Sequence, residues 1–328
     1  MLSITKYTAK YLNQWNDFVL KSSNGTLFHN RNFLDYHLDR EFIDISLLFF
    51  DKENLVAIIS ASQIEKNKTK IFSSHPGASY GGLVLSKKIK FKTVDKIINL
   101  LEKYCLNNGF TNITLINTPS LYFNKKTENL DYLLKWNGFK ESETYISHIT
   151  DLTYHDDPNN FLGNRKKRYI KNLREKSKIT CKEDNKIENF YSILFDNKKK
   201  YNSTPTHSLE EIRILMKRFP NEIKLFISSD EKKIIGGVLL FILNSKIGLV
   251  FYNVIANDYR KTQTATLQLF EAIKFFKSAG LEYVDFGVSH TPEMKNSLAP
   301  KFSLIEFKEQ FGAEGVIRKV YMKDIKCN

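Results

Sequence analysis

A lysine between two phenylalanines is the residue of this chain best suited to catalysis. Lys308 lies in the segment Phe307–Ala313, where Phe307 and Phe311 would anchor the side chain and partly desolvate its ammonium group. A desolvated cation can stabilise an oxyanion as it forms. The alternative is a surface lysine whose stem covers the apolar face of an amphipathic helix. Asp285, which precedes Gly287 at the end of an expected strand, is suited to orient a substrate or act as a base, or else to cap the following turn.

Basic residues gather in one segment that could bind phosphate. The stretch from Arg165 to Lys178 holds eight basic residues, several of them at helical spacing. Such a cluster favours phosphate recognition, although a solvated charged face would look the same. We expect the phosphates of a substrate to meet this segment. The candidate residues are Arg165, Lys167, Arg168 and Lys171.

A glycine-bearing loop from Ser74 to Gly82 supplies two further candidates. Glycine lets the backbone approach a ligand closely, and an aromatic ring can stack on a base or a sugar. His75 and Tyr80 lie in this loop. We interpret both as contacts to the accepting substrate, with an exposed loop histidine as the plainer reading of His75.

A second loop precedes an expected helix from Ala265 to Ser278. The start of a helix presents free backbone N–H groups and the positive end of the dipole, so this loop can hold a pyrophosphate. The candidate residues are Arg260, Lys261, Thr262, Gln263, Thr264 and Ala265.

These candidates are positioned by elements that occur twice. The turn and strand that begin at Asp51 return at Asp230, and an amphipathic helix that ends at Gly109 returns before Gly280. After each glycine, apolar residues occupy the fourth and sixth positions. Two similar strand–helix–strand units predict two like domains with a cleft between them, although chance similarity of two α/β halves is the alternative.

Helical and alternating patterns complete the expected α+β organisation. We expect mixed sheets flanked by helices, with a first domain over 1–155, a boundary at the Asp156-Asp157-Pro158 turn and a second domain over 156–328. The expected helices are 11–22, 94–108, 165–178, 187–201, one that starts with a capping box at Ser208, and 265–278. The expected strands are 42–50, 55–64, 113–116, 224–228, 234–243, 248–256, 283–288 and 317–322, and the segment 139–152 closes the first domain.

Composition limits the class of protein. With 328 residues, 42% hydrophobic and 13% aromatic, the chain can fill two cores of about 150 residues each. Its apolar runs are shorter than the roughly 20 residues that span a bilayer, and we expect a cytoplasmic protein. Three widely spaced cysteines and seven histidines suggest neither disulfides nor a metal site. The net charge of +14 favours anionic partners, although a lysine-rich genome could explain much of it.

The helix-entry loop resembles the coenzyme A loop of GNAT acyltransferases. That loop reads Arg/Gln-x-x-Gly-x-Gly/Ala; Arg260 and Ala265 fit it, whereas Gln263 stands where the family has glycine. The doubled layout, Asp285-Phe286-Gly287 and the Phe307–Ala313 segment resemble FemABX-type acyl- and aminoacyltransferases, which are tandem GNAT-fold proteins. Residues 74–82 resemble FemAB-like proteins encoded beside cell-surface polysaccharide genes. In related enzymes the lysine of the Phe-Lys segment lies at the reaction centre, which the resemblance implies for Lys308.

The resemblance implies an N-acyltransferase of cell-envelope biogenesis. The expected donor is an acyl-CoA, acetyl-CoA first, and the expected acceptor is the amine of an anionic envelope precursor, such as a nucleotide-linked amino sugar or a lipid-linked precursor. The alternative donor is aminoacyl-tRNA, with a peptidoglycan or peptide amine as acceptor. That donor is less favoured because the long helical arm of the peptidoglycan enzymes has no counterpart here.

A hypothesis of another class is a non-catalytic basic protein that binds RNA or an anionic membrane surface. It depends on the net charge and on the segment Arg165–Lys178. We expect no metal and no DNA partner, peripheral membrane contact at most, and a monomer, because an internal repeat already supplies the two lobes that a dimer would build.

Overall fold

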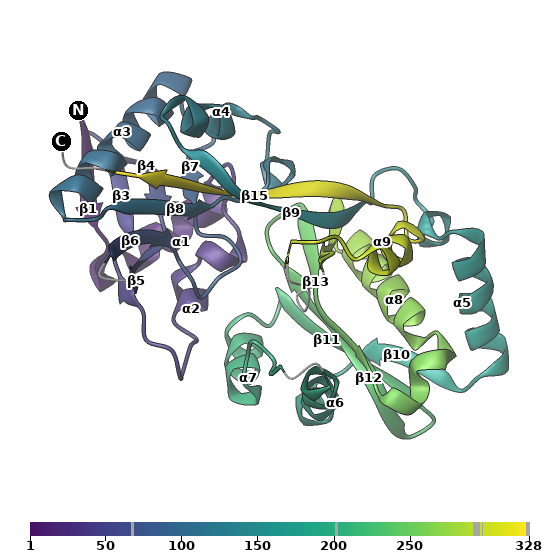
Figure 1. The fold of residues 1–328 in the computed structure, drawn as a ribbon. Helices are drawn as coiled ribbons and strands as arrows, with labels where there is room; N and C mark the ends of the chain where they lie inside the picture. Colours follow the sequence, from purple (N-terminus) through teal and green to yellow (C-terminus); the bar gives the residue numbers. More distant parts are fainter. Residues whose placement is uncertain (67–68, 201–202, 291–295, 297, 326–328) are drawn as a thin grey trace. The chain divides into compact units, whose positions relative to one another are not determined.

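Two units of helices and mixed β-sheets make up the chain in this computed structural model, which describes residues 1–66, 69–200, 203–290, 296 and 298–325 (Figure 1). The first unit is Met1–Tyr145 with Ile317–Asn328, and the second is Ile146–Val316. This division differs from the expected boundary near residue 155. The reason is that the end of β15 (Ala313–Asp324) pairs with β8 (Asn112–Ile116), so the last strand completes the first unit.

The first unit contains two sheets. One has the strand order β1-β3-β4-β7, and within this unit the other runs β15-β8-β6-β5-β2. Its strands are β1 (Leu2–Lys6), β2 (Ile43–Asp44), β3 (Leu47–Asp51), β4 (Asn54–Ile59), β5 (Ala61–Lys66), β6 (Thr69–Ser74), β7 (Leu83–Leu85), β8 and the start of β9 (Lys140–Asp151). Its helices are α1 (Leu12–Lys21), α2 (Arg31–Leu34), α3 (Phe91–Asn107) and α4 (Asn129–Trp136), with short 3-10 turns at Ala9–Tyr11, Leu27–His29 and Ser120–Tyr122.

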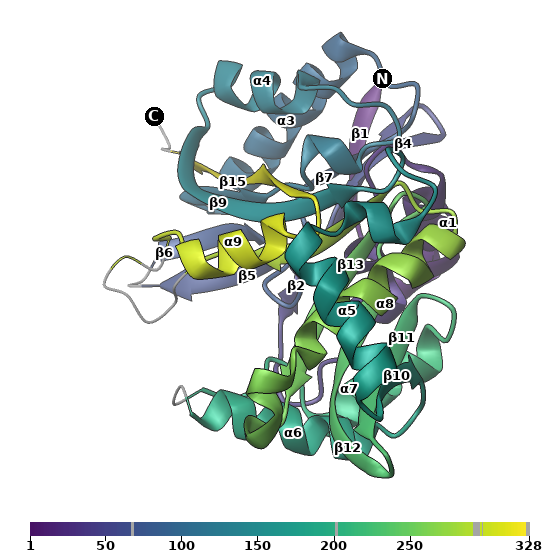
Figure 2. The same cartoon turned by 90° about the vertical axis from the view of Figure 1, so that its right-hand side faces the viewer.

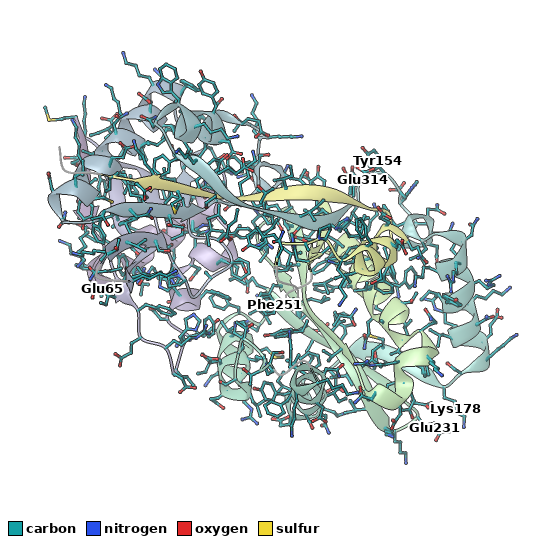
Figure 3. The ribbon with its side chains drawn as sticks, viewed as in Figure 1. Glu65, Tyr154, Lys178, Glu231, Phe251 and Glu314 are labelled. Atoms are coloured by element: carbon teal, nitrogen blue, oxygen red, sulfur yellow. The ribbon has the colours of Figure 1, made fainter. Side chains whose placement is uncertain are left out.

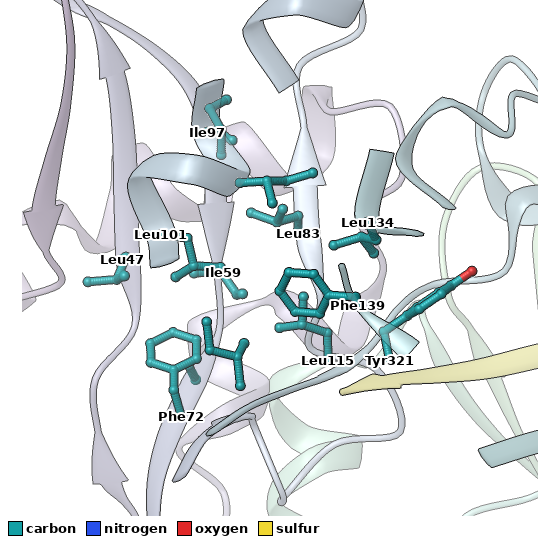
Figure 4. Close-up of a cluster of buried hydrophobic side chains, with 14 of the residues drawn as sticks. Leu47, Ile59, Phe72, Leu83, Ile97, Leu101, Leu115, Leu134, Phe139 and Tyr321 are labelled. Atoms are coloured by element: carbon teal, nitrogen blue, oxygen red, sulfur yellow. The ribbon is translucent and has the colours of Figure 1, made fainter. Parts of the chain in front are cut away.

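Alternation along β3, β4 and β7 gives the first sheet two buried faces. Leu48, Ile58 and Val84 pack with Trp15 of α1. Their neighbours along the strands point the other way and join the residues of α3 and α4 in a larger core. Figure 4 shows part of this core, including Leu47, Ile59, Leu83, Ile97, Leu101, Leu134 and Tyr321. Side chains alternate between the faces of a strand, so a sheet covered on both faces reads as a nearly continuous apolar run.

The second unit has one sheet with the order β10-β11-β12-β13-β14-β9. Its elements are a 3-10 turn at Pro158–Phe161, α5 (Asn164–Lys176), β10 (Ile179–Glu183), α6 (Ile187–Lys199), α7 (Leu209–Arg218), β11 (Ile223–Asp230), β12 (Lys233–Ile242), β13 (Ile247–Ile255), η5 (Asn257–Thr262), α8 (Thr264–Ser278), β14 (Tyr283–Val288), α9 (Phe302–Glu309) and the start of β15. Helices α5 and α8 lie on one face of the sheet, and α6 and α7 lie on the other (Figures 1 and 2). The predicted capping box is present, since Ser208 Oγ accepts the Glu211 N–H at 3.2 Å and Glu211 Oε2 accepts the Ser208 N–H at 2.8 Å.

The two units repeat the same hairpin in detail. In each, the first turn residue has a positive φ, 56° at Lys52 and 50° at Glu231; Figure 3 labels Glu231 beside Lys178, its ion-pair partner. Each hairpin then carries a bulge at the same distance from the turn, with Val56 and Ile235 as the extra residues. The repeat predicted from sequence therefore extends to an irregularity of the backbone that no propensity would specify.

The helix and strand that follow are also repeated. Helices α3 and α8 both end before a glycine in the left-handed region, Gly109 at φ 74° and Gly280 at φ 77°. The next strand in each unit, β8 or β14, makes a short parallel ladder, β8 with β6 and β14 with β13. This strand–helix–strand arrangement positions the candidate site.

Candidate active site

In the second unit, β13 and β14 pair briefly and then separate. The ladder joins Ile247–Leu249 to Tyr283–Asp285, whereas β13 continues to Ile255 and β14 to Val288. The separated strand ends line a pocket of about 370 Å³ that extends to Lys308 of α9. Beyond Leu249, the edge of β13 on the β14 side pairs with no strand among the described residues. This edge can offer backbone N–H and C=O groups to an extended ligand in the pocket.

A bulge in β13 lies at the wall of the pocket. Val250 pairs with Leu240 and Tyr252 with Leu239, so Phe251 is the extra residue. The ring of Phe251, which is labelled in Figure 3, stacks on Phe241 with the centroids 4.5 Å apart and the planes 10° apart. The N–H of a bulged residue lies outside the regular ladder. Phe251 also lines the pocket, so the irregular part of β13 forms part of its wall.

The predicted pyrophosphate loop forms one end of this pocket. Arg260 and Ala265 line it, and Arg260 Nη2 lies 3.4 Å from Oδ1 of Asn197. The first turn of α8 starts here, with N–H groups that have no intrahelical acceptor. Gln263, which stands in the place of the expected glycine, has φ 61° and ψ 19°. The backbone therefore adopts the conformation that a glycine would favour, although the residue is glutamine.

Gln263→Gly is expected to tighten binding of acetyl-CoA by roughly threefold or more, because it removes a side chain from a helix start that can hold a pyrophosphate. The left-handed strain relieved, about 1 kcal/mol, nearly offsets the entropy that glycine adds to the unfolded chain. The free energy of unfolding should therefore change little. Calorimetric titration and urea unfolding measure both quantities. Lys52→Gly is the matched control because it relieves the same strain at φ 56° in the first unit. Equal or weaker acetyl-CoA binding by the Gln263 variant would contradict the assignment of this loop.

Lys308 forms the other end of the pocket. Its side chain is only 4% exposed. Nζ donates to Gly287 O at 2.7 Å, Val288 O at 3.0 Å and Ser289 Oγ at 2.9 Å. The alternative of an exposed lysine on an amphipathic helix is thus wrong. Instead, the ammonium group joins α9 to the end of β14 and holds a positive charge at the pocket wall.

Two residues that the sequence did not single out continue from Lys308. Ser289 Oγ lies 2.9 Å from Nδ1 of His148 on β9, and both residues are buried. Burial lowers the pKa of His148, and the Lys308 charge lowers it further against the opposing effect of Glu309 and Asp285. His148 is therefore neutral near pH 7 and can accept a hydrogen bond or a proton through Ser289. No local pattern marks His148, since it is one residue of an alternating strand.

Asp285 takes the arrangement of a turn cap. It is fully buried, and its Oδ1 accepts the N–H of Gly287 at 2.6 Å. Gly287 has φ 76°, a left-handed conformation that suits glycine. This geometry matches the capping alternative for Asp285. Its part in the reaction stays a prediction, and the carboxylate contributes to the electrostatics of His148.

The basic segment forms α5, as predicted. Arg165, Arg168 and Lys171 are exposed and Lys167 is half-buried, and Lys171 Nζ lies 3.9 Å from Glu175. Lys166, which the sequence interpretation passed over, is the buried cation of this helix, at 4% exposure. A lysine among seven other basic residues gives no sequence signal that its side chain points inward.

The glycine-bearing loop belongs to the first unit. It follows β6, and the N–H groups of Gly81 and Gly82 both donate to Ile116 O at the end of β8, each at 3.1 Å. In the first unit, β8 is the strand that corresponds to β14, and the loop is hydrogen-bonded to its end. In the second unit, by contrast, β13 and β14 diverge around a pocket. This contrast supports a division of roles between the two repeats.

The two loop candidates are buried. The Tyr80 ring is 2% exposed and packs against Phe28 and Tyr122, with Arg318 over its face at 4.6 Å. His75 is 4% exposed, and burial lowers its pKa to about 4. Contacts from either residue to an acceptor stay predictions.

The described residues contain neither a cluster of metal-ligand side chains nor a helix that could span a membrane. No set of three or more histidine, cysteine or acidic side chains is grouped there as metal ligands would be. In the same part of the chain, every helix is too short or too polar to cross a bilayer. Cys327 lies outside the described residues.

Comparison with known proteins rests on structure alone. No protein-family model matches this chain, and no curated protein matches it. Among solved structures, FemX superimposes with a TM-score of 0.73 over 98% of this chain and 97% of its own, at 11% identity. A tandem GNAT protein from the clavulanic acid biosynthesis pathway gives 0.58 over 100% of both chains, at 10% identity. L-PGS from Bacillus licheniformis gives 0.57 over 96% of this chain and 91% of its own, at 9% identity.

These similarities define the fold. The chain has the FemX-like fold of two tandem GNAT-type domains, with mixed sheets flanked by helices. The resemblance predicted from the repeat and from the Phe307–Ala313 segment is confirmed at this level.

Proposed function

We propose that the protein is an acyltransferase that moves an acyl group from acyl-CoA to the amine of an anionic cell-envelope precursor. The observation that carries this proposal is the pocket between the diverging ends of β13 and β14, which runs from the loop at Arg260 to Lys308. An extended thioester carrier fits such a pocket, with its amides along β13, its pyrophosphate at the start of α8 and its acyl group near Lys308.

Each group at the acyl end has a proposed part in the reaction. The tetrahedral oxyanion is stabilised by the Lys308 charge and by the N–H of the bulged Phe251. All three Lys308 donors are engaged, so an oxyanion would replace the bond to Ser289, whose hydroxyl keeps His148 as a partner. Neutral His148 then takes up the proton of the attacking amine through Ser289. Collapse of the tetrahedral intermediate breaks the thioester C–S bond and releases CoA as a thiolate, which takes a proton from solvent.

The acceptor is proposed to be anionic, because the chain carries a net charge of +14 and α5 exposes several cations. A nucleotide-linked amino sugar is the first choice, and a lipid-linked precursor is the second. The reaction is proposed to take place in the cytoplasm, where acyl-CoA is available.

Arg168→Ala is expected to raise the acceptor KM by about 10- to 100-fold with kcat little changed, the pattern of lost uniform binding. Arg168 is exposed, so the variant should fold normally. Lys176→Ala, which removes an exposed cation at the far end of the same helix, is the control. Steady-state kinetics with a nucleotide-linked amino sugar give both parameters. An unchanged acceptor KM for Arg168→Ala would show that this part of α5 does not bind the acceptor. The same measurement on Tyr80→Ala tests separately whether the first unit contacts the acceptor.

Binding of donors tests the proposal directly. Acetyl-CoA and longer acyl-CoAs are titrated into the protein, and products are sought by mass spectrometry with amino-sugar acceptors. The fold shared with FemX keeps an aminoacyl-tRNA donor as the second candidate. If no CoA thioester binds and tRNA binds with submicromolar affinity, aminoacyl-tRNA becomes the favoured donor and acyl-CoA is excluded. A non-catalytic basic protein would bind RNA or anionic vesicles with steep salt dependence, would give no acyl product, and would be indifferent to replacement of Lys308.

A further inference from the structure

A second pocket lies beside the start of α8. It has a volume of about 300 Å³ and is lined from four elements. The lining includes Arg165 and Lys166 of α5, Arg260 of η5, Ala265 of α8 and Phe307 of α9. It shares Arg260, Ala265 and Phe307 with the pocket between β13 and β14. The two pockets therefore meet at the first turn of α8.

Lys166 is the unusual residue of this second pocket. Its side chain is 4% exposed, and its Nζ donates to Thr266 Oγ1 at 3.1 Å. Aromatic rings surround the ammonium group, with the Phe307 centroid 4.4 Å away and those of Tyr169 and Phe311 at 5.6 and 5.7 Å. No carboxylate in the described part of the chain lies within ion-pair distance of this group.

A buried ammonium with one neutral hydrogen-bond acceptor is costly, because the aromatic faces and a hydroxyl replace only part of its hydration. Burial lowers the pKa of Lys166, and Arg165 lowers it further. An anion in the adjoining pocket would supply the missing counter-charge. Glu306, the acidic residue at this pocket, is exposed. With Arg165, Lys166 and Arg260 opposite one carboxylate, the lining keeps a positive balance.

We propose that this pocket binds a phosphate group of the donor's nucleotide carrier, with Lys166 as the desolvated cation that holds it. The proposal rests on the proposed acyl-CoA donor and adds a side-chain phosphate site to the backbone site at the start of α8. Phosphate suits the pocket because Arg165 and Arg260 can each offer a planar fork of donors to its oxygens, while Lys166 supplies a point charge. The volume of about 300 Å³ also admits more of a nucleotide than one phosphate.

The test compares Lys166→Met with Lys176→Met. Both remove one charge from α5, but Lys176 is exposed in the last turn of the helix and does not line the pocket. Calorimetry measures the Kd of CoA, dephospho-CoA, pantetheine and inorganic pyrophosphate. Lys166→Met is expected to weaken CoA binding at least about tenfold, because it removes one charge-assisted contact. It should leave the affinity for pantetheine, which lacks phosphate, unchanged. Lys176→Met should change neither affinity by more than about twofold. Equal losses for CoA and dephospho-CoA assign the site to the pyrophosphate, whereas a loss confined to CoA assigns it to the 3′-phosphate.

Thermal unfolding without ligand separates a binding role from a structural one. If Lys166 awaits an anion, methionine relieves an uncompensated buried charge and the apo Tm stays or rises. If Lys166 serves packing and the bond to Thr266, the apo Tm falls while the CoA affinity stays, which would overturn the proposal. Lys166→Arg, which keeps the charge, should retain CoA affinity within about threefold. Should Lys166→Met fold poorly, Arg165→Gln gives the same comparison from the exposed edge of the pocket.

The outcomes also distinguish this site from the proposed function. In one outcome, pantetheine and CoA bind with equal affinity and Lys166→Met changes neither affinity. This would exclude the phosphate site but not the acyl-CoA donor. The opposite result is that pyrophosphate binds the wild type but not Lys166→Met, while pantetheine does not bind and CoA binds no more tightly than pyrophosphate. That result would support the phosphate site and exclude acyl-CoA as the donor.

Discussion

Lys308→Met is expected to lower kcat by roughly 10²- to 10³-fold, the usual loss when one oxyanion donor is removed from an acyl-transfer site. Methionine fills the space of the lysine stem but supplies neither charge nor donor. The KM for acyl-CoA should change little, because the carrier is held along β13 and at the start of α8. Pre-steady-state product formation with saturating donor and acceptor measures the chemical step.

The same substitution has a structural cost that must be measured beside it. The buried Ser289 Oγ and the part-buried Gly287 O and Val288 O all lose their donor. A buried acceptor left unpaired costs about 1–3 kcal/mol, and a part-buried one costs less because water can replace the donor. Urea unfolding of the variant gives this loss, and assays are run where the variant is fully folded. Phe302→Ala, a change at an exposed residue of the same helix, should keep full activity. A folded Lys308→Met protein with wild-type kcat would show that the lysine only joins α9 to β14.

The repeat was predictable because local sequence patterns indicate it. Turn chemistry, helix periodicity and the glycine after each helix are signals within a few residues, and both copies of the hairpin and of the helix–strand unit occur where those signals fall. The capping box at Ser208 is a signal of the same kind. The division into units was less predictable, since pairing of β15 with β8 joins residues far apart in the sequence.

The candidate site was predictable in part. Lys308 and the loop from Arg260 to Ala265 lie at the two ends of one pocket, and both carry sequence motifs. His148, Ser289 and Lys166 carry no motif, because their importance comes from burial and from partners on other elements. A sequence shows that α5 is basic, but only the packing of α5 on α8 decides which lysine is buried.

Gln263 illustrates the limit of a motif. The absence of glycine argues against close approach of a pyrophosphate, yet the residue adopts a left-handed conformation that glycine would favour. The backbone at Gln263 therefore has the geometry that a glycine would favour, although the residue is glutamine. The side chain, which receives a hydrogen bond from Thr266 at 3.2 Å, is what distinguishes this loop from the family pattern.

Acidification is expected to destabilise the first unit through His29. This residue is fully buried, and its Nδ1 accepts the N–H of Thr26 at 3.1 Å and lies 3.0 Å from the Thr26 hydroxyl. Its Nε2 has no hydrogen-bond partner among the described residues. Burial lowers the pKa of His29 from 6.5 to about 4. Protonation would place a proton on Nδ1, where it would disrupt both contacts to Thr26.

The sign of the effect follows from the lowered pKa. The unfolded chain binds a proton at His29 near pH 6.5 and the folded chain only near pH 4, so stability is complete above pH 6.5 and falls as the pH drops between these values. The loss from His29 is about 3 kcal/mol at pH 4. His75, whose pKa is also lowered to about 4, adds to the same slope.

The measurement is urea unfolding between pH 7.5 and 4, followed by the fluorescence of Trp15, which donates to His29 O at 2.7 Å. A Trp136→Phe background isolates this signal, since the chain has two tryptophans. His29→Asn keeps an acceptor for the Thr26 N–H but cannot titrate. Its free energy of unfolding should start lower at pH 7.5 and then fall by about 3 kcal/mol less than that of the background protein as the pH drops to 4. His155→Asn, which removes an exposed histidine, should leave the slope unchanged. Parallel pH profiles for His29→Asn and the background protein would mean that His29 is not the group whose protonation opens the first unit.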